Sequence, residues 1–158
     1  MKRISVDDVE TPASVSPASV LRPLSAALGA EGVAVNYFEL APGESFGYDY
    51  HRHLDQEEVF YVLAGTATFE TESGTVDLGP GEAVRFAPGE FQLGWNRGER
   101  RVVALALGAP RGSTGIEYLR ACPTCAGRTL QTPELVDGAN AVVVRCTGCG
   151  SAVDRLAL

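Results

Sequence analysis

The chain has 158 residues, a length that allows one domain of ordinary size, or one domain with a small appendage. Its 13 basic and 20 acidic residues give a formal net charge of -7, which argues against a surface that binds nucleic-acid phosphates or anionic lipid. The composition is 45% hydrophobic and can fill a core, yet no apolar run approaches the roughly 18 residues that span a bilayer. The first ten residues include acidic side chains where a secretory signal needs an apolar stretch. We therefore expect a cytoplasmic protein with reduced cysteines and no membrane partner.

The predicted elements begin with an N-terminal arm. Residues 1–30 are rich in Ser, Ala and Pro and hold one predicted short helix, which begins at Pro23 and ends at Gly29. Short β-type runs then recur at regular spacing between Pro-Gly pairs, as is typical of a sandwich or barrel. These runs are 33–40, 58–63, 66–71, 83–86 and 101–107. The sequence predicts an all-β barrel over 31–110, followed by a linker at 111–118.

The four cysteines follow this linker in two Cys-x-x-Cys pairs separated by 20 residues. They are Cys122, Cys125, Cys146 and Cys149. Two intervening residues let both thiolates of a pair face one ion, and four thiolates close the tetrahedral shell of Zn²⁺ without an open position. We therefore predict a structural zinc site, with two disulfides, a redox-active dithiol or a rubredoxin-type iron site as the alternatives. The module, residues 119–158, resembles the zinc ribbon family over about 119–155, where the Asp137-Gly138 turn and the β-branched run 142–144 supply a hairpin.

The cysteine module is small. A piece of about 40 residues cannot normally stabilise itself through a core, so we expect its folding to require the metal. Four arginines balance four acidic residues over 113–158, which argues against nucleic acid as a partner. The remaining roles for the cysteine module are contact with a partner protein and capping of the barrel.

The two histidines of the chain, His51 and His53, are two residues apart, a spacing that places both rings on one face of a strand. Glu58 begins the apolar run that ends at Leu63, and a neighbouring antiparallel strand can bring its carboxylate to the same point. Gly65 then closes that strand with a turn. This order of residues resembles the first motif of the cupin superfamily, whose jelly-roll-like, double-stranded β-barrel holds a metal in its mouth.

A second cupin-like motif follows with alterations. The segment Gly81–Phe86 enters a strand, and Gln92 and Asn96 end the motif. Gln92 occupies a position that is usually histidine in cupins, and Ser45 replaces a glycine of the first motif. The two motifs cover residues 43–98. A cupin with an altered second motif, followed by a zinc ribbon, resembles a group of small uncharacterised archaeal proteins.

This resemblance implies a metal site made of His51, His53 and Glu58, the set of two histidines and one carboxylate that binds non-haem Fe(II). Gln92 would add an amide oxygen as a further ligand, or orient a bound water or substrate. An amide oxygen favours Fe(II) or Mn(II) over Cu(II), and Ni(II) and Zn(II) are the other candidates for this second divalent metal. The ion keeps a net positive charge, which suits a small, anionic, oxygen-rich ligand. The alternative is a barrel that has kept the fold and lost its metal.

Three functions stay open. The first is an Fe(II)- or Mn(II)-dependent oxygenase, isomerase or lyase acting on a small acid or carbonyl compound, with no catalytic base assigned. The second is a non-enzymatic module that binds or senses a small ligand while its zinc ribbon contacts a partner protein. The third is a structural dimer with an inactive pocket. Cupin barrels commonly pair through their sheets, so the resemblance also implies a homodimer.

Overall fold

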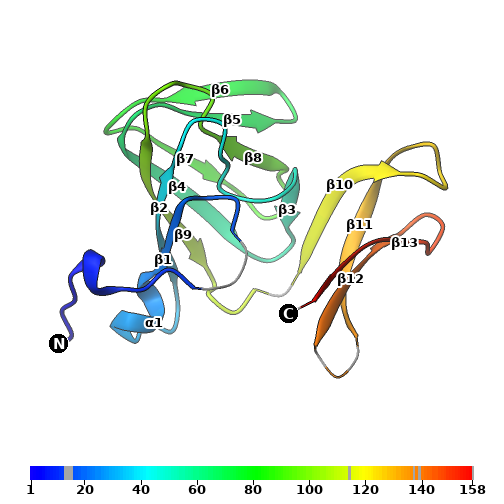
Figure 1. Ribbon diagram of the computed structural model, residues 1–158, viewed down its shortest axis with the longest axis horizontal. Coiled ribbons are helices and arrows are strands. Elements are labelled where there is room, and N and C mark those ends of the chain that lie inside the picture. The colour runs from blue at the N-terminus through cyan, green and yellow to red at the C-terminus, as the bar shows by residue number, and fades with distance from the viewer. Residues whose placement is uncertain (13–15, 114, 137, 139, 158) are drawn as a thin grey trace.

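The chain folds into two antiparallel sheets with little helix (Figure 1). The structure is a computed structural model, and it describes residues 1–12, 16–113, 115–136, 138 and 140–157. The helical elements are η1 (Val6–Asp8) and α1 (Leu24–Leu28). The strands are β1 (Val20–Pro23), β2 (Ala34–Leu40), β3 (His51–His53), β4 (Glu57–Ala64), β5 (Ala67–Thr71), β6 (Gly74–Leu78), β7 (Ala83–Phe86), β8 (Gln92–Trp95), β9 (Val102–Ala109), β10 (Ile116–Cys122), β11 (Gly127–Val136), β12 (Ala141–Cys146) and β13 (Ala152–Ala157).

One sheet has the strand order β1-β2-β9-β4-β7 among the described residues, and the other has the order β13-β12-β11-β10-β3-β8-β5-β6. The first sheet and strands β3, β5, β6 and β8 form the barrel, and β10 to β13 stand beside it (Figure 1). The prediction of an all-β, double-stranded barrel followed by a small cysteine module is confirmed. No helix in the described part of the chain is long and apolar enough to cross a membrane.

The barrel core lies between the two sheets and is built around phenylalanine. Phe69 on β5 is fully buried, and its ring centroid lies 4.9 Å from that of Phe60 on β4 and 5.7 Å from that of Phe46. Strand β9 alternates buried and half-buried residues along its length, as expected for a strand with one face on the core. This packing fixes the distance between the sheets, which sets the distance between residues that face each other across the barrel.

The predicted helix at the end of the arm is confirmed. Helix α1 begins after Pro23 and ends at Gly29, whose φ of 72° is the left-handed conformation that commonly terminates a helix. The arm also supplies β1, which pairs with β2 and forms an edge of the five-stranded sheet. The five predicted β-type runs correspond to β2, β4, β5, β7 and β9.

The segment after the barrel differs from its prediction. The linker was expected over 111–118, but β10 begins at Ile116 and pairs with β3 through its first three residues. The cysteine module is therefore joined to the barrel by sheet hydrogen bonds as well as by the chain. The hairpin predicted within the module is formed by β11 and β12, while Asp137 of the predicted turn lies outside the described residues.

The turn at Gly65 allows a stability prediction. Its φ is 76°, and a Cβ added there would lie 2.4 Å from the backbone oxygen of Arg101. We expect Gly65→Ala to lower the free energy of unfolding by about 2–4 kcal/mol, since the strained φ and the clash both act. The control is Gly43→Ala, where φ is 84° but no atom of the described residues lies within 4 Å of the added Cβ, so about 1 kcal/mol should be lost. Urea denaturation of both variants measures the difference, and equal losses would contradict the steric argument.

Candidate functional site

The two histidines lie on β3 with their rings on the same face, as their spacing predicts. The ring centroids of His51 and His53 are 5.3 Å apart, with the planes nearly perpendicular at 84°. His51 Nδ1 lies 2.7 Å from the backbone oxygen of Asp49. A carbonyl oxygen can only accept, so Nδ1 carries the hydrogen and Nε2 keeps the lone pair that a metal needs.

Glu58 reaches the histidines from the opposite sheet. It lies on β4, which pairs with β7 and β9 and not with β3, so the prediction that a neighbouring antiparallel strand carries the carboxylate is wrong. Glu58 Oε1 is 3.6 Å from His53 Nε2, and the ligand atoms of the two histidines and Glu58 all lie within 4.8 Å of one another. An ion about 2.1 Å from each atom holds such atoms roughly 3–3.5 Å apart, so only small adjustments are needed to bind it.

Gln92 is directed into the same site. It lies on β8 opposite His51, and its amide nitrogen is 2.9 Å from Glu58 Oε2 and 3.2 Å from His51 Nε2. Its amide oxygen is buried and has no hydrogen-bond partner among the described residues. Leaving a buried acceptor unpaired is costly, so an orphaned oxygen beside three ligand-type side chains fits a site that receives a cation. Asn96 does not take part, because its amide nitrogen donates to backbone oxygens of Leu40 and Arg100.

Burial sets the charges of the site. It lowers the pKa of His51 and, together with the neighbouring His51 ring, lowers the pKa of His53 to about 4. Both rings are therefore neutral near pH 7, which is the form that binds metals. Burial raises the pKa of Glu58 to about 7, and the hydrogen bond from Gln92 opposes this rise. The site lacks a positive charge on its own ligand-type side chains at neutral pH, and a divalent cation would supply one.

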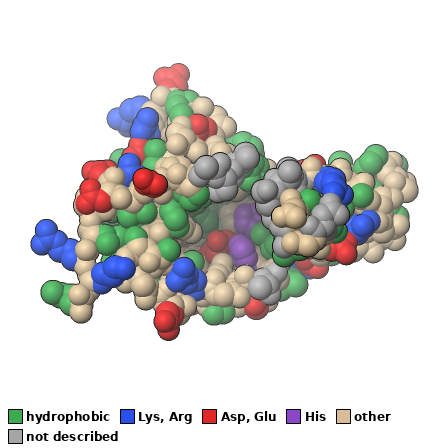
Figure 2. All heavy atoms as spheres, turned by 60° about the horizontal axis from the view of Figure 1, so that its bottom comes forward, with side chains coloured by type: hydrophobic (Ala, Val, Ile, Leu, Met, Phe, Trp, Pro, Cys, Tyr) green, Lys and Arg blue, Asp and Glu red, His purple; other side chains and the backbone are tan. Residues whose placement is uncertain are grey.

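The site is open to small molecules. Figure 2 shows the histidine side chains at the bottom of a hollow in the surface, with an acidic side chain beside them. The side chains of His53 and Glu58 remain 19% and 18% exposed. A separate open groove of about 460 Å³ lies between barrel and cysteine module and includes Tyr48, Trp95 and Arg128, but none of the candidate ligands lines it.

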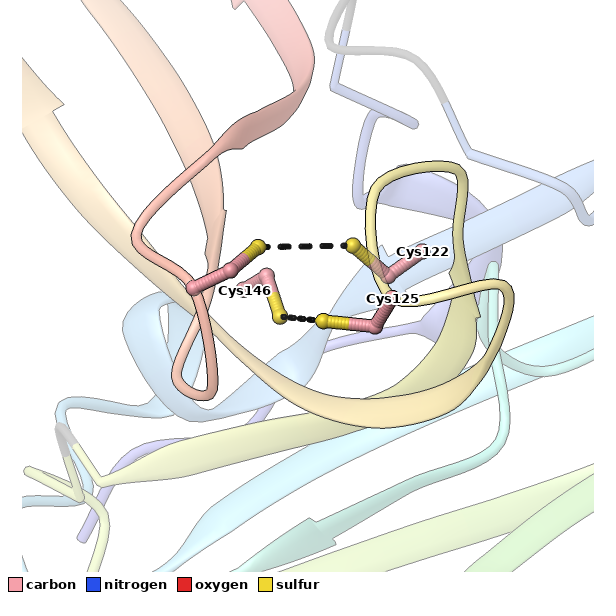
Figure 3. A group of neighbouring side chains, drawn as sticks. Cys122, Cys125 and Cys146 are labelled. Atoms are coloured by element: carbon pink, nitrogen blue, oxygen red, sulfur yellow. Dashed lines mark hydrogen bonds between the residues drawn. The ribbon is translucent and has the colours of Figure 1, made fainter.

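The four cysteines converge from two loops and are not joined by disulfides (Figure 3). The sulfur of Cys122 is 3.7 Å from that of Cys149, and the sulfur of Cys125 is 3.8 Å from that of Cys146. Four sulfurs placed 2.3 Å from a tetrahedral zinc ion are separated by about 3.8 Å. The described geometry, with four free cysteines close together, fits a four-thiolate metal site such as that of zinc.

Hydrogen bonds shift the thiol pKa values of Cys146 and Cys125 in opposite directions. The hydroxyl of Thr129, 3.2 Å from the sulfur of Cys146, and backbone donors lower the pKa of Cys146 to about 6. Without a cation, hydrogen bonds to the neighbouring sulfurs raise the pKa of Cys125 to about 12. The residue after the second cysteine of each pair has a left-handed conformation, and it is Ala126 in one turn and Gly150 in the other.

Sequence reasoning missed two residues beside the histidines. Ile116 and Tyr118 lie on β10 directly opposite His53 and His51. Their alternation is a strand pattern, but both fall within the linker predicted at 111–118, next to a stretch rich in glycine that has no apolar periodicity. Nothing in the local sequence indicates which strand β10 pairs with.

The comparisons with known proteins agree with this architecture. Residues 36–108 match the Cupin_2 family, described as a cupin domain, and no curated protein matches the chain in sequence. A sugar phosphate isomerase from Silicibacter pomeroyi, described as from a cupin superfamily, superposes with a TM-score of 0.68 at 18% identity, over 99% of this chain and 92% of its own. The polyketide cyclase RemF from Streptomyces resistomycificus superposes with a TM-score of 0.64 at 25% identity, over 78% of this chain and 88% of its own. A predicted oxalate decarboxylase from Thermotoga maritima superposes with a TM-score of 0.59 at 21% identity, over 69% of this chain and 99% of its own.

The sequence match and the shared fold support the cupin superfamily for the barrel. Within it, His51, His53 and Glu58 form a group that could bind a metal, and the four cysteines form a second group that could hold zinc. The likeness of the cysteine module to zinc ribbons, and of the whole chain to archaeal proteins, stays a prediction.

Proposed function

We propose that this protein is a metal-dependent cupin that acts on a small, anionic, oxygen-rich molecule at an ion held by His51, His53 and Glu58. The observation that carries the proposal is the convergence of these three side chains from two opposite sheets, with ligand atoms within 4.8 Å of one another. Placing two neutral imidazoles and a carboxylate at the bottom of one hollow costs free energy of desolvation. A bound cation offsets that cost.

The ion and the residues around it would have separate roles at this site. A divalent ion, Fe(II) or Mn(II) first and Ni(II) or Zn(II) next, would supply Lewis acidity toward a carbonyl or carboxylate oxygen. Asp49 fixes the tautomer of His51 through its backbone oxygen, and Glu58 balances part of the charge of the ion. Gln92 lies close enough to His51 and Glu58 to orient a ligand of the ion through its amide. The zinc held by the four cysteines would have a structural role, because four thiolates leave no open position.

The class of substrate follows from the charge of the ion and the openness of the hollow. One carboxylate and two neutral rings leave a divalent ion with a net charge of about +1, which attracts carboxylates, enolates and phosphates. Two of the similar structures described above are named as acting on oxygen-rich molecules, as an isomerase of sugar phosphates and a cyclase of polyketides. An isomerase or lyase acting on such a compound is therefore our first choice for this chain, and a homodimer is its proposed assembly.

The test begins with metal content. Purified protein should release one divalent ion to a mild chelator and keep a second until the cysteines are denatured or modified, because an open site exchanges faster than a closed one. Glu58→Gln should abolish rebinding of Fe(II) or Mn(II). The matched control is Glu57→Gln, since Glu57 points outward to Arg85 and is 45% exposed. Failure of all four ions to bind the parent protein would overturn the proposal.

Turnover separates an enzyme from a binding module. Protein reloaded with each ion is mixed with sugar phosphates, hydroxy acids and keto acids, and conversion is followed by proton NMR. Conversion that needs His51 supports the enzyme. Ligand binding that perturbs the spectrum of the ion without conversion would support the non-enzymatic module instead.

A further inference from the structure

The cysteine module supplies one wall of the barrel site. Strand β10 pairs with β3 so that Ile116 lies opposite His53 and Tyr118 lies opposite His51. Directly opposed residues on neighbouring antiparallel strands point to the same face, so both side chains share the face of the histidines. The ring centroids of Tyr118 and His51 are 6.2 Å apart, with a tilt of 53°. The site thus has side chains from both parts of the chain.

Strand β3 depends on β10 for most of its pairing. It has only three residues, of which one, His51, has a paired residue on β8, whereas all three are paired with β10. Backbone hydrogen bonds of 2.9 and 2.8 Å extend the pairing past both ends, donated by Leu119 on one side and Leu54 on the other. Without β10, the strand that carries both histidines would lie at an edge of the barrel, held by its pairing at His51 and by a backbone hydrogen bond of 2.7 Å that Gly89 donates to the oxygen of His53.

The opposite face of β10 is fixed to the barrel as well. Glu117 accepts hydrogen bonds of 2.9 and 2.7 Å from Nε and Nη2 of Arg52, and both side chains are largely buried. A second apolar cluster covers this face and combines barrel and module residues, namely Tyr50, Phe91, Leu93, Trp95, Leu119 and Leu130. Through these contacts β10 connects the two parts of the chain, and Figure 1 shows it running from beside β3 into the cysteine module.

The same strand leads to the cysteines. It ends at Cys122, about 13 Å along the strand from Tyr118 at 3.3 Å per residue. The pairing also continues across the sheet, because Tyr118 lies opposite Gln131 and Gln131 lies opposite Cys146. Gln131 is fully buried and donates to the backbone oxygens of Arg120 and Ala121. One row of opposed residues therefore runs from His51 to Cys146.

We propose that the metal held by the cysteines controls the barrel site by ordering β10, and that Tyr118 is the positioning residue through which it acts on His51. This inference rests on the proposed function only where metal binding at the barrel is measured. The hydrogen exchange of the histidine strand tests it independently. Loss of the ribbon metal loosens β11 and β12, then β10, and finally the histidine strand. The barrel ion is then bound more weakly although none of its own ligands has changed.

The test uses the full chain and two readouts. The parent is compared with the double variant Cys146→Ser, Cys149→Ser, which lacks the ribbon metal, and with Leu135→Ser, a control on an exposed side chain of β11. Mn(II) binding by electron paramagnetic resonance should weaken 10- to 100-fold in the double variant, as for other residues that support metal ligands. Hydrogen exchange of amides 51–53 should quicken at least tenfold, while the amides of β9 stay protected. The control should match the parent in both readouts.

Tyr118 variants test the route. Tyr118→Ala should weaken Mn(II) binding with the ribbon metal still present, whereas Tyr118→Phe, which keeps the ring against His51, should restore it. Unchanged exchange at 51–53 and unchanged Mn(II) affinity in the double variant would overturn the inference. If the parent binds no divalent ion at the barrel, the proposed function fails, and the exchange of 51–53 still decides whether the cysteine centre controls β3.

Discussion

Cys146→Ser should release the ribbon metal and leave residues 119–157 open to proteases within a time in which the parent is not cut. The buried side chains of the module are few, so its folding free energy must come largely from the metal, which contributes roughly 10–16 kcal/mol in small zinc modules. The lowered pKa of Cys146 means that little proton competition opposes metal binding at this thiol near neutral pH. Limited proteolysis with mass spectrometry, together with zinc analysis, measures the effect.

The control for this experiment is Leu135→Ser, because Leu135 is 64% exposed on β11 and is paired with Val142 and not with a cysteine. It should keep one zinc per chain and the protease resistance of the parent. The core around Phe69 should stay folded in both variants, since it lies in the barrel. A metal-free Cys146→Ser protein with a protected module would show that zinc is not what folds it.

His51→Ala should abolish divalent ion binding at the barrel, with an affinity loss of more than about 100-fold, because it removes one of three ligands and leaves Glu58 with His53 alone. Gln92→Ala should weaken binding by only about 10- to 100-fold if the amide orients a ligand. Gln92→His should strengthen binding of Zn(II) and Ni(II), which favour imidazole. Titrations of the chelator-treated proteins measure all three affinities.

The Gln92 variants also test the assignment of the second motif. The amide is 2.9 Å from Glu58 and buried, so a histidine at this position would face the same ion. Affinities for Zn(II) and Ni(II) that match the parent in Gln92→His would contradict this geometry. Equal losses in His51→Ala and Gln92→Ala would instead show that the amide is a full ligand.

The sequence was informative wherever a feature depends on neighbouring residues. The spacing of His51 and His53 sets their common face, and Cys-x-x-Cys sets each half of the cysteine centre, because strand and turn geometry act over a few residues. Apolar runs such as 102–107 identify strands for the same reason. Strand β6 was not predicted, because four of its five residues are exposed and form no apolar pattern.

The sequence did not predict which strands lie beside or opposite each other. Glu58 was expected at the site, but it reaches the histidines from the opposite sheet, across a barrel whose core includes Phe69. The pairing of β10 with β3 joins residues more than 60 positions apart, through contacts such as that of Arg52 with Glu117. Local sequence does not encode such a register, because it is chosen by the complementary surface that the rest of the fold presents.

Strand β10 has a further consequence for solubility. A barrel without it would present the backbone donors and acceptors of β3 to solvent, and an unpaired strand edge is a template for joining another molecule. The module displaces the end of the sheet outward to β13, where the charged Asp154 and Arg155 discourage such joining. A chain shortened to its first 110 residues should therefore form intermolecular sheets and precipitate, even though its barrel core is complete.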